Sequence, residues 1–165
     1  MFANLLISLG ESRIGTAVAE SPTLFPWIEV VHVIGIATVV GTIMLVDLRL
    51  LGVAALDYPF TRFSRTLLPL TWIGFLFALV SGLLLFSSQP VLYWENWYFR
   101  AKMLLLLLAG LNMLLFHFMA ARGVTRWERT VTIPAAARIA GAVSLVLWVL
   151  VVAAGRWIGF TMTPF

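Results

Sequence analysis

The chain has 165 residues, of which 62% are hydrophobic and 11% are charged, and its formal net charge is +4. A soluble domain carries about 25% charged residues, so this composition excludes an ordinary soluble enzyme and indicates that lipid solvates many side chains. The absence of cysteine excludes disulfides and thiolate metal sites. No basic cluster alternates with aromatic residues as nucleic-acid binding requires, so the positive charge indicates membrane orientation.

Residues 1–22 form a distinct segment at the start of the chain. Its apolar residues fall on one helical face: Phe2, Leu5, Leu6 and Leu9. Glu11 and Arg13 interrupt this run, which is too short for a signal peptide and lacks the basic start of one. We therefore expect an amphipathic helix that lies in the membrane interface. A frayed terminus is the alternative.

Residues 23–165 are expected to form one transmembrane domain, because they contain four apolar runs of the ~20 residues needed to cross a bilayer. The spans are expected near residues 26–51, 67–87, 99–121 and 136–160. Pro69 falls in the first turns of the second span and Pro134 just before the fourth, where a missing N–H is tolerated. Short connections make sequential helices antiparallel neighbours. The predicted fold is therefore all-α, an integral membrane antiparallel four-helix bundle.

Small residues predict where these helices meet. On the second span they recur every four residues, at Gly74, Ala78 and Gly82, and the first span has Ala37 and Gly41 in the same spacing. Membrane helices associate through such residues because these allow the backbones to approach closely.

The basic residues predict the orientation of the bundle. Seven lie at the ends of the spans that are joined by the first and third connections: Arg49, Arg62, Arg65, Arg122, Arg126, Arg129 and Arg138. Four lie at the opposite ends: Arg13, Arg100, Lys102 and Arg156. The positive-inside rule then places the first set in the cytoplasm and both termini outside. Four tryptophans at the outer boundary suit an aromatic belt: Trp27, Trp94, Trp97 and Trp157.

A layer of ionisable residues is expected in the outer part of the bundle. Its members are Glu29, His32, Lys102 and Arg156. His32 lies six residues past Pro26, about 9 Å along the helix, and Glu29 shares its face. An ionisable group within a span is by default a functional hypothesis. The structural alternatives are a satisfied Glu29–His32 pair and basic side chains that extend to the lipid headgroups.

A second polar layer is expected near the inner end. Asp47 lies 21 residues past Pro26 and His117 lies 18 past Phe99, so the two match in depth and are able to pair. The two histidines are then roughly 18 Å apart along the bundle axis. This separation argues against one haem held between His32 and His117.

Three segments carry a resemblance to a known family: FPWIEVVHVIGIATVVGTIMLVDLRLLG, LLPLTWIGFLFALVSGLLLF and FRAKMLLLLLAGLN. The chain resembles a family of uncharacterised bacterial four-helix membrane proteins, a domain of unknown function, and is distantly similar to the CopD and HemJ-type membrane proteins. In those, a histidine early in one span and a lysine at the start of a later span recur, and HemJ-type members bind haem b. The resemblance implies a bacterial inner membrane, in which the orientation predicted from the basic residues makes both termini periplasmic. It matches His32 to the haem-ligating histidine and Lys102 to the lysine. The LLP segment replaces a Thr-Pro motif of the HemJ group, so the resemblance does not extend to protoporphyrinogen oxidation.

Two functions remain open on these residues. The first is haem b binding and electron transfer, with His32 as the axial ligand to iron and Glu29 as an acceptor that orients its ring. Lys102 and Arg156 would bind propionates or an anionic quinone head. Met103 is the plausible thioether for a second axial ligand, and a five-coordinate haem or Lys102 as the second ligand also remains open. The alternative is a non-catalytic structural or accessory subunit of a larger membrane complex, or a homo-oligomer, in the lipid bilayer. A small transporter ranks last, since no inverted repeat or polar midplane is present.

Overall fold

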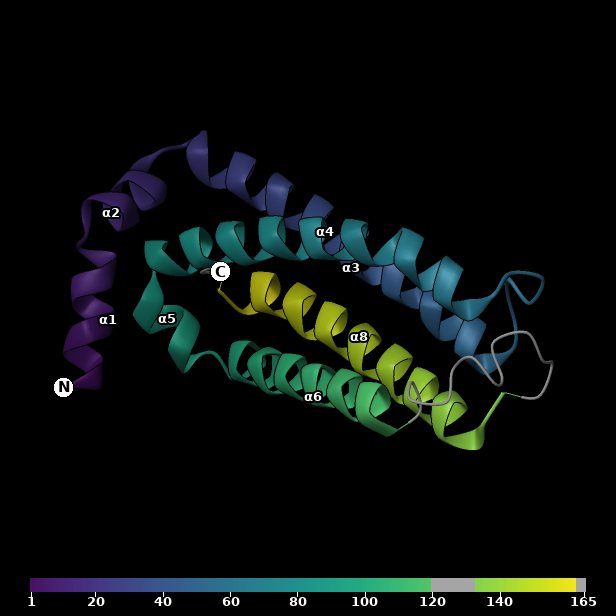
Figure 1. Cartoon of the computed structure of the whole chain (residues 1–165). Helices are drawn as coiled ribbons and strands as arrows, with labels where there is room; N and C mark the ends of the chain where they lie inside the picture. Colours follow the sequence, from purple (N-terminus) through teal and green to yellow (C-terminus); the bar gives the residue numbers. More distant parts are fainter. Residues whose placement is uncertain (120–132, 163–165) are drawn as a thin grey trace.

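The computed structural model describes residues 1–119 and 133–162, and no strand occurs in them. Their helices are α1 (Phe2–Gly10), α2 (Arg13–Glu20), α3 (Leu24–Leu51), α4 (Phe60–Ser88), α5 (Pro90–Glu95), α6 (Trp97–Met119) and α8 (Ala135–Met162) (Figure 1). The predicted all-α class is confirmed. Arg122, Arg126 and Arg129, counted in the predicted orientation, lie outside the described residues, as do positions 120–121 of the third predicted span and the last three residues.

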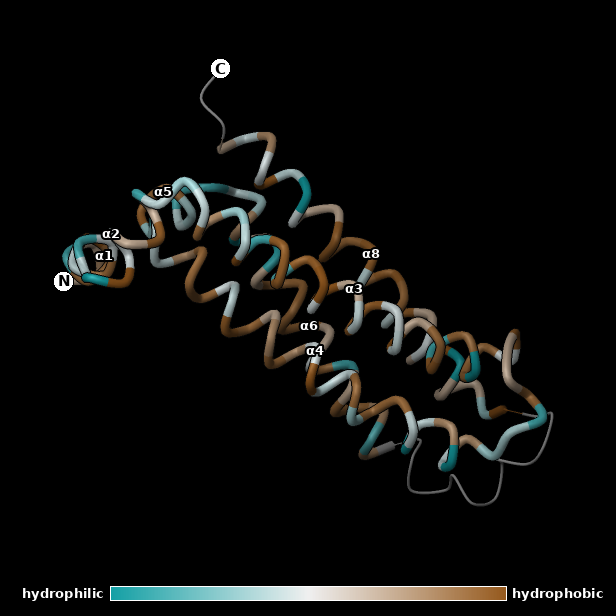
Figure 2. Tube along the Cα trace, turned by 90° about the horizontal axis from the view of Figure 1, so that it is seen from above, coloured by the Kyte–Doolittle hydropathy of each residue, from teal (hydrophilic) through white to brown (hydrophobic). Residues whose placement is uncertain are grey.

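Four helices in the described part of the chain are long and apolar enough to cross a membrane: α3, α4, α6 and α8. At most 17% of the most apolar stretch of each helix is buried, so most of its apolar side chains face outward. Figure 2 shows hydrophobic residues along the lengths of these helices. The chain is therefore a multi-pass membrane protein with lipid as the solvent of its apolar surface.

Three pairs among these helices pack closely: α3 with α4, α3 with α8, and α6 with α8 (Figures 1 and 2). Within the α3–α4 pair, residues with higher numbers on α3 contact residues with lower numbers on α4. Gly35 lies beside Ala78, and Thr38 lies beside Gly74. α4 and α6 are joined instead by aromatic side chains, through Phe60 and Phe116 at one end of the bundle.

Glycine allows the close approach of α3 and α4. A Cβ added to Gly35 would lie 2.8 Å from the Ala78 nitrogen, and one added to Gly74 would lie 2.9 Å from the Thr38 side chain. The prediction that Gly74 and Ala78 mark a helix contact is confirmed. The corresponding prediction for α3 is wrong, because a Cβ at Gly41 would meet nothing within 4 Å and Ala37 is exposed.

The second span is longer than predicted. α4 begins at Phe60, because the polar residues after Asp57 form its first turns rather than a loop. Pro69 consequently lies inside the helix, where it removes one backbone hydrogen bond. α3 ends as predicted before Gly52, whose φ of 80° is the left-handed conformation that glycine adopts without strain.

Two short helices stand where one amphipathic helix was expected. α1 ends at Gly10, and the Ser12 side chain starts α2 by accepting a hydrogen bond from the Gly15 nitrogen. They pack on the end of the bundle that also carries α5, which we call the terminal end (Figure 1): α1 contacts α5 and α2 contacts α4. Gly15 permits the second contact, since a Cβ there would lie 2.6 Å from the Ser87 carbonyl oxygen.

At the opposite end of the bundle, a small core joins α3, α4 and α8 through Leu50, Phe60 and Ala137. Arg49 lies in the same region with only 1% of its surface exposed, and its Nη2 donates to the Tyr58 carbonyl at 3.2 Å. This core sets the spacing of the helices at one end, and the candidate site lies toward the other.

Candidate functional site

His32 is held from α4 by a hydrogen bond that determines its tautomer. Its Nδ1 lies 3.0 Å from the Ser81 hydroxyl oxygen. That hydroxyl donates its single hydrogen to the Phe77 carbonyl, so it accepts from the ring, and Nδ1 carries the proton. The Ala78 carbonyl, 3.4 Å from the same hydroxyl, is a second acceptor beside the ring. Nε2 is left with a lone pair, the form in which imidazole binds a metal.

Gly82 provides the space in which the His32 ring lies. A Cβ at Gly82 would lie 2.9 Å from Cε1 and 3.4 Å from Nδ1 of the ring. Ser81 is 3% exposed, so the bonded side of the imidazole is enclosed by α4. Gly82 was predicted to be a helix-packing residue, and Ser81 was not predicted to belong to the site. Their position opposite His32 depends on how α3 and α4 pack.

Lys102 of α6 lies near both the His32 ring and α8. It lies close enough to His32 to act on it electrostatically. Its Nζ is 3.5 Å from the position that a Cβ on Gly155 would occupy, so its chain runs along α8. No hydrogen bond or ion pair joins this ammonium group to residues 1–119 or 133–162. His32, Ser81, Lys102 and Gly155 therefore place one residue from each spanning helix at one level.

The other predicted members of the outer layer are not part of this cluster. Glu29 is exposed and acts on Tyr93 of α5, and burial together with that charge raises the pKa of the Tyr93 hydroxyl. Arg156 is exposed and lies over the Phe160 ring at 4.6 Å. Met103 is 39% exposed. Of the predicted site residues, the structure brings together only His32 and Lys102.

An aromatic cluster covers the terminal side of this site. The Phe86 and Phe99 rings stack with their centroids 5.3 Å apart and their planes 12° apart, and Tyr93 lies 5.6 Å from Phe99. Phe86 is four residues beyond Gly82, and Phe99 is three before Lys102, so the cluster lies about one helical turn from the polar pair. The stacked rings of Phe86 and Phe99 form the contact between α4 and α6 at this level.

The predicted inner pair is not brought together. Asp47 is 4% exposed and its carboxylate bonds to Ser144 of α8, while its Oδ2 has no hydrogen-bond partner. Asp47 also lines a cavity of about 20 Å³ with five apolar residues: Val40, Met44, Leu145, Trp148 and Val149. His117 is exposed, with its ring 6.1 Å from that of Phe118.

The described residues contain no group of three or more His, Cys, Asp or Glu side chains able to hold a metal ion. A ligand at the four-helix site would therefore rest on one imidazole nitrogen and one ammonium group. Of these two groups, only the imidazole nitrogen has a lone pair to offer a metal ion, and the ammonium group suits an anionic group.

No curated protein and no solved structure matches the chain. The profile of one family, a family of unknown function (DUF6644), matches residues 21–161. The match covers all four spanning helices and both polar side chains of the candidate site, and it leaves out α1 and α2. Because it extends over most of the sequence, the chain belongs to the DUF6644 family.

Proposed function

We propose that this protein binds haem b in the membrane and transfers electrons, with His32 as the residue that would hold the haem iron. The observation that carries the proposal is the bond from His32 Nδ1 to Ser81, because it leaves the Nε2 lone pair available for iron. The resemblance of His32 and Lys102 to the recurrent histidine and lysine of HemJ-type proteins supports the same residues. When bound, the haem would supply a one-electron carrier.

The other residues of the site have roles that fit such a group. The Lys102 ammonium has no partner in the described chain, so a propionate carboxylate would neutralise it within the span. Ser81 would hold the imidazole at a fixed angle, and Gly82 leaves room for its ring. Where α4 and α6 meet, the contact is made by aromatic rings, Phe60 with Phe116 and Phe86 with Phe99. Arg156 and Met103, both exposed, are left out of this arrangement.

We further infer the membrane placement from charge and composition. The bundle would be antiparallel in a bacterial inner membrane, with its terminal end toward the periplasm. α1 and α2 would then lie in the periplasmic interface, as expected of an amphipathic segment. The His32–Lys102 site would sit in the outer half of the bilayer, within reach of a periplasmic redox partner.

A second candidate is an accessory subunit of a larger complex or a homo-oligomer. It is favoured by the exposed face of α3 at Ala37 and Gly41, where small residues meet no other described helix. Such a face permits close approach by a helix of another chain. The two candidates differ in whether the purified protein carries a chromophore.

The test is an absorption spectrum of the protein purified in detergent from haem-supplied cells, oxidised and then reduced with dithionite. We expect a Soret band and a reduced α-band that disappear in His32→Ala. His117→Ala is the matched control, since it removes the exposed histidine, and it should keep both bands. A featureless wild-type spectrum would reject the haem proposal and leave the accessory role. Bands that persist in His32→Ala would reject His32 as the residue that holds the haem.

A further inference from the structure

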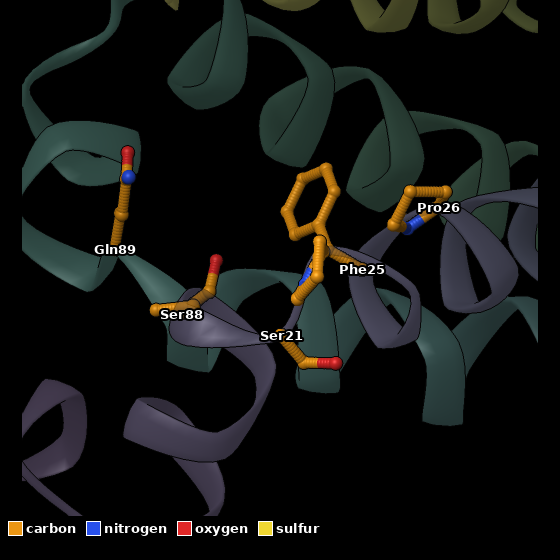
Figure 3. Close-up of a pocket in the computed structure, with 7 residues that line it drawn as sticks. Ser21, Phe25, Pro26, Ser88 and Gln89 are labelled. Atoms are coloured by element: carbon orange, nitrogen blue, oxygen red, sulfur yellow. The ribbon is translucent and has the colours of Figure 1, made fainter.

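A pocket separate from the His32–Lys102 site lies at the terminal end, between the α2–α3 connection and the α4–α5 junction. Its volume is about 340 Å³, and its lining comes from residues 19–26 and 88–89: Ala19, Ser21, Pro22, Phe25, Pro26, Ser88 and Gln89. Figure 3 shows Ser88 and Gln89, at the junction of α4 and α5, on one side and Phe25 and Pro26, at the start of α3, on the other. This size falls at the lower end of the range of about 300–1,000 Å³ for small-molecule sites.

The lining is mixed in polarity but carries no charged residue. Phe25 and the two prolines provide flat apolar walls. The main-chain carbonyl of Gln89 accepts a hydrogen bond from the Tyr93 nitrogen, whereas no hydrogen bond joins its side-chain amide to the described residues. The amide therefore offers both a donor and an acceptor. Ser88 donates to the Leu85 carbonyl at 2.6 Å, and its oxygen remains an acceptor. These groups suit a flat uncharged head that carries carbonyl or hydroxyl oxygens, and they disfavour a charged headgroup.

The place of the pocket suits a molecule dissolved in the membrane. It lies where the short helices of the terminal end join the spanning helices (Figure 1). Trp27, in the first turn of α3, and Trp94, on α5, are both exposed. Exposed tryptophans at the ends of spans mark the level of the lipid–water boundary. A ligand there can place its polar head in the pocket and its tail among the lipid chains. His32 follows Phe25 by seven residues, about 10 Å along α3.

We propose that this pocket binds the head of an isoprenoid quinone or quinol. The shared chemistry is an uncharged oxygen-bearing head on a hydrocarbon tail, which a neutral lipid such as diacylglycerol also has, and the flat walls favour a ring. Binding itself does not depend on haem; the role of the quinone as electron partner of a haem held by His32 rests on the proposed function.

The experiment uses the full-length protein in phospholipid nanodiscs with a photoreactive azido-ubiquinone analogue, followed by peptide mapping. We expect labelling within residues 19–26 or 88–95, displaced by unlabelled ubiquinone but not by diacylglycerol. Gln89→Leu should weaken labelling about tenfold, the equivalent of one lost hydrogen bond. Phe25→Ala should weaken it as well, while Phe160→Ala, an exposed aromatic outside the pocket, should not.

Labelling elsewhere, unchanged labelling in Gln89→Leu, or equal displacement by diacylglycerol would overturn the quinone site. His32→Ala separates this proposal from the haem proposal. That variant should keep wild-type labelling even though it loses the haem spectrum. A folding defect in Gln89→Leu would show as loss of its thermal transition, and Gln89→Glu then provides the second test, since a charge in this pocket should also abolish labelling.

Discussion

The Ser81 hydroxyl and His32 Nδ1, 3.0 Å apart, link α4 to α3 at the level where α6 contributes Lys102. The hydroxyl has one hydrogen and gives it to its own helix, so it can only accept from the imidazole. A hydrogen bond made by a serine to its own backbone thereby decides which nitrogen of a histidine on another helix is available to a ligand.

Removing this hydroxyl should weaken haem binding without removing the ligand. We expect Ser81→Ala to lower haem affinity by about 10- to 100-fold, the usual effect of losing a partner that orients a ligating histidine. Haem titration of the apoprotein, followed at the Soret band, measures it. Ser87→Ala is the control, because Ser87 is also buried on α4 and bonds only to Leu84 of its own helix. Equal affinities for wild type and Ser81→Ala would assign Ser81 to helix packing.

Substitution by alanine should have opposite effects on protein stability at two glycines of α3. In Gly35→Ala the new Cβ would lie 2.8 Å from the Ala78 backbone nitrogen, so the helices must separate, at a cost of about 1–3 kcal/mol. In Gly41→Ala the Cβ meets open space, and the higher helix propensity of alanine should stabilise the protein or leave it unchanged. Thermal unfolding in one detergent compares the two. Similar transition temperatures would contradict the close α3–α4 contact.

Replacing Lys102 by a neutral residue should weaken haem binding without lowering the stability of the apoprotein. The ammonium lacks a partner in the described chain, so Lys102→Met should leave the apoprotein as stable as wild type or more stable. The same variant should bind haem more weakly, because the propionate loses its cation. Arg100→Gln is the control, since Arg100 is exposed and lies 5.6 Å from the Trp97 ring centroid. A destabilised Lys102→Met apoprotein would mean that the ammonium has a structural partner.

The proposed orientation can be read from single cysteines, since the chain has none of its own. Asp57→Cys, in the connection between α3 and α4, should be protected from a membrane-impermeant thiol reagent in intact cells. Glu95→Cys, exposed at the terminal end, should react rapidly. Both should react after the membrane is permeabilised. The reverse pattern in intact cells would place the termini in the cytoplasm.

The span predictions were accurate where long apolar runs decide the outcome. α3 and α8 start and end within two residues of the predicted limits, because a segment in lipid must satisfy its own backbone and continues until polar residues end it. The predicted start of the second span was too late because Thr61, Arg62 and Ser64 are polar and were left outside the span. They are helical because a spanning helix can extend beyond the apolar core with polar first turns.

The site was only half predictable. His32, Lys102, Glu29 and Arg156 were predicted to lie together because each is a similar number of residues from the outer end of its helix. A similar position along the bundle axis is not sufficient for contact. Contact also depends on the rotation of each helix about its axis, which the packing sets. α3 turns His32 toward Ser81 while Glu29 stays exposed, and α8 presents Gly155 to Lys102 while Arg156 faces outward.

The sequence by itself determined that this chain is an all-α membrane protein with four spans, because composition and the length of apolar runs depend only on the solvent that the chain must occupy. It also predicted how far along its helix each polar residue lies, since the rise of a helix is constant. Only the tertiary structure decided which polar residues meet. The rotation of each helix follows from where glycine leaves room for a neighbouring backbone or side chain. Gly35, Gly74, Gly82 and Gly155 could be told apart from Gly41 only once their neighbours were known.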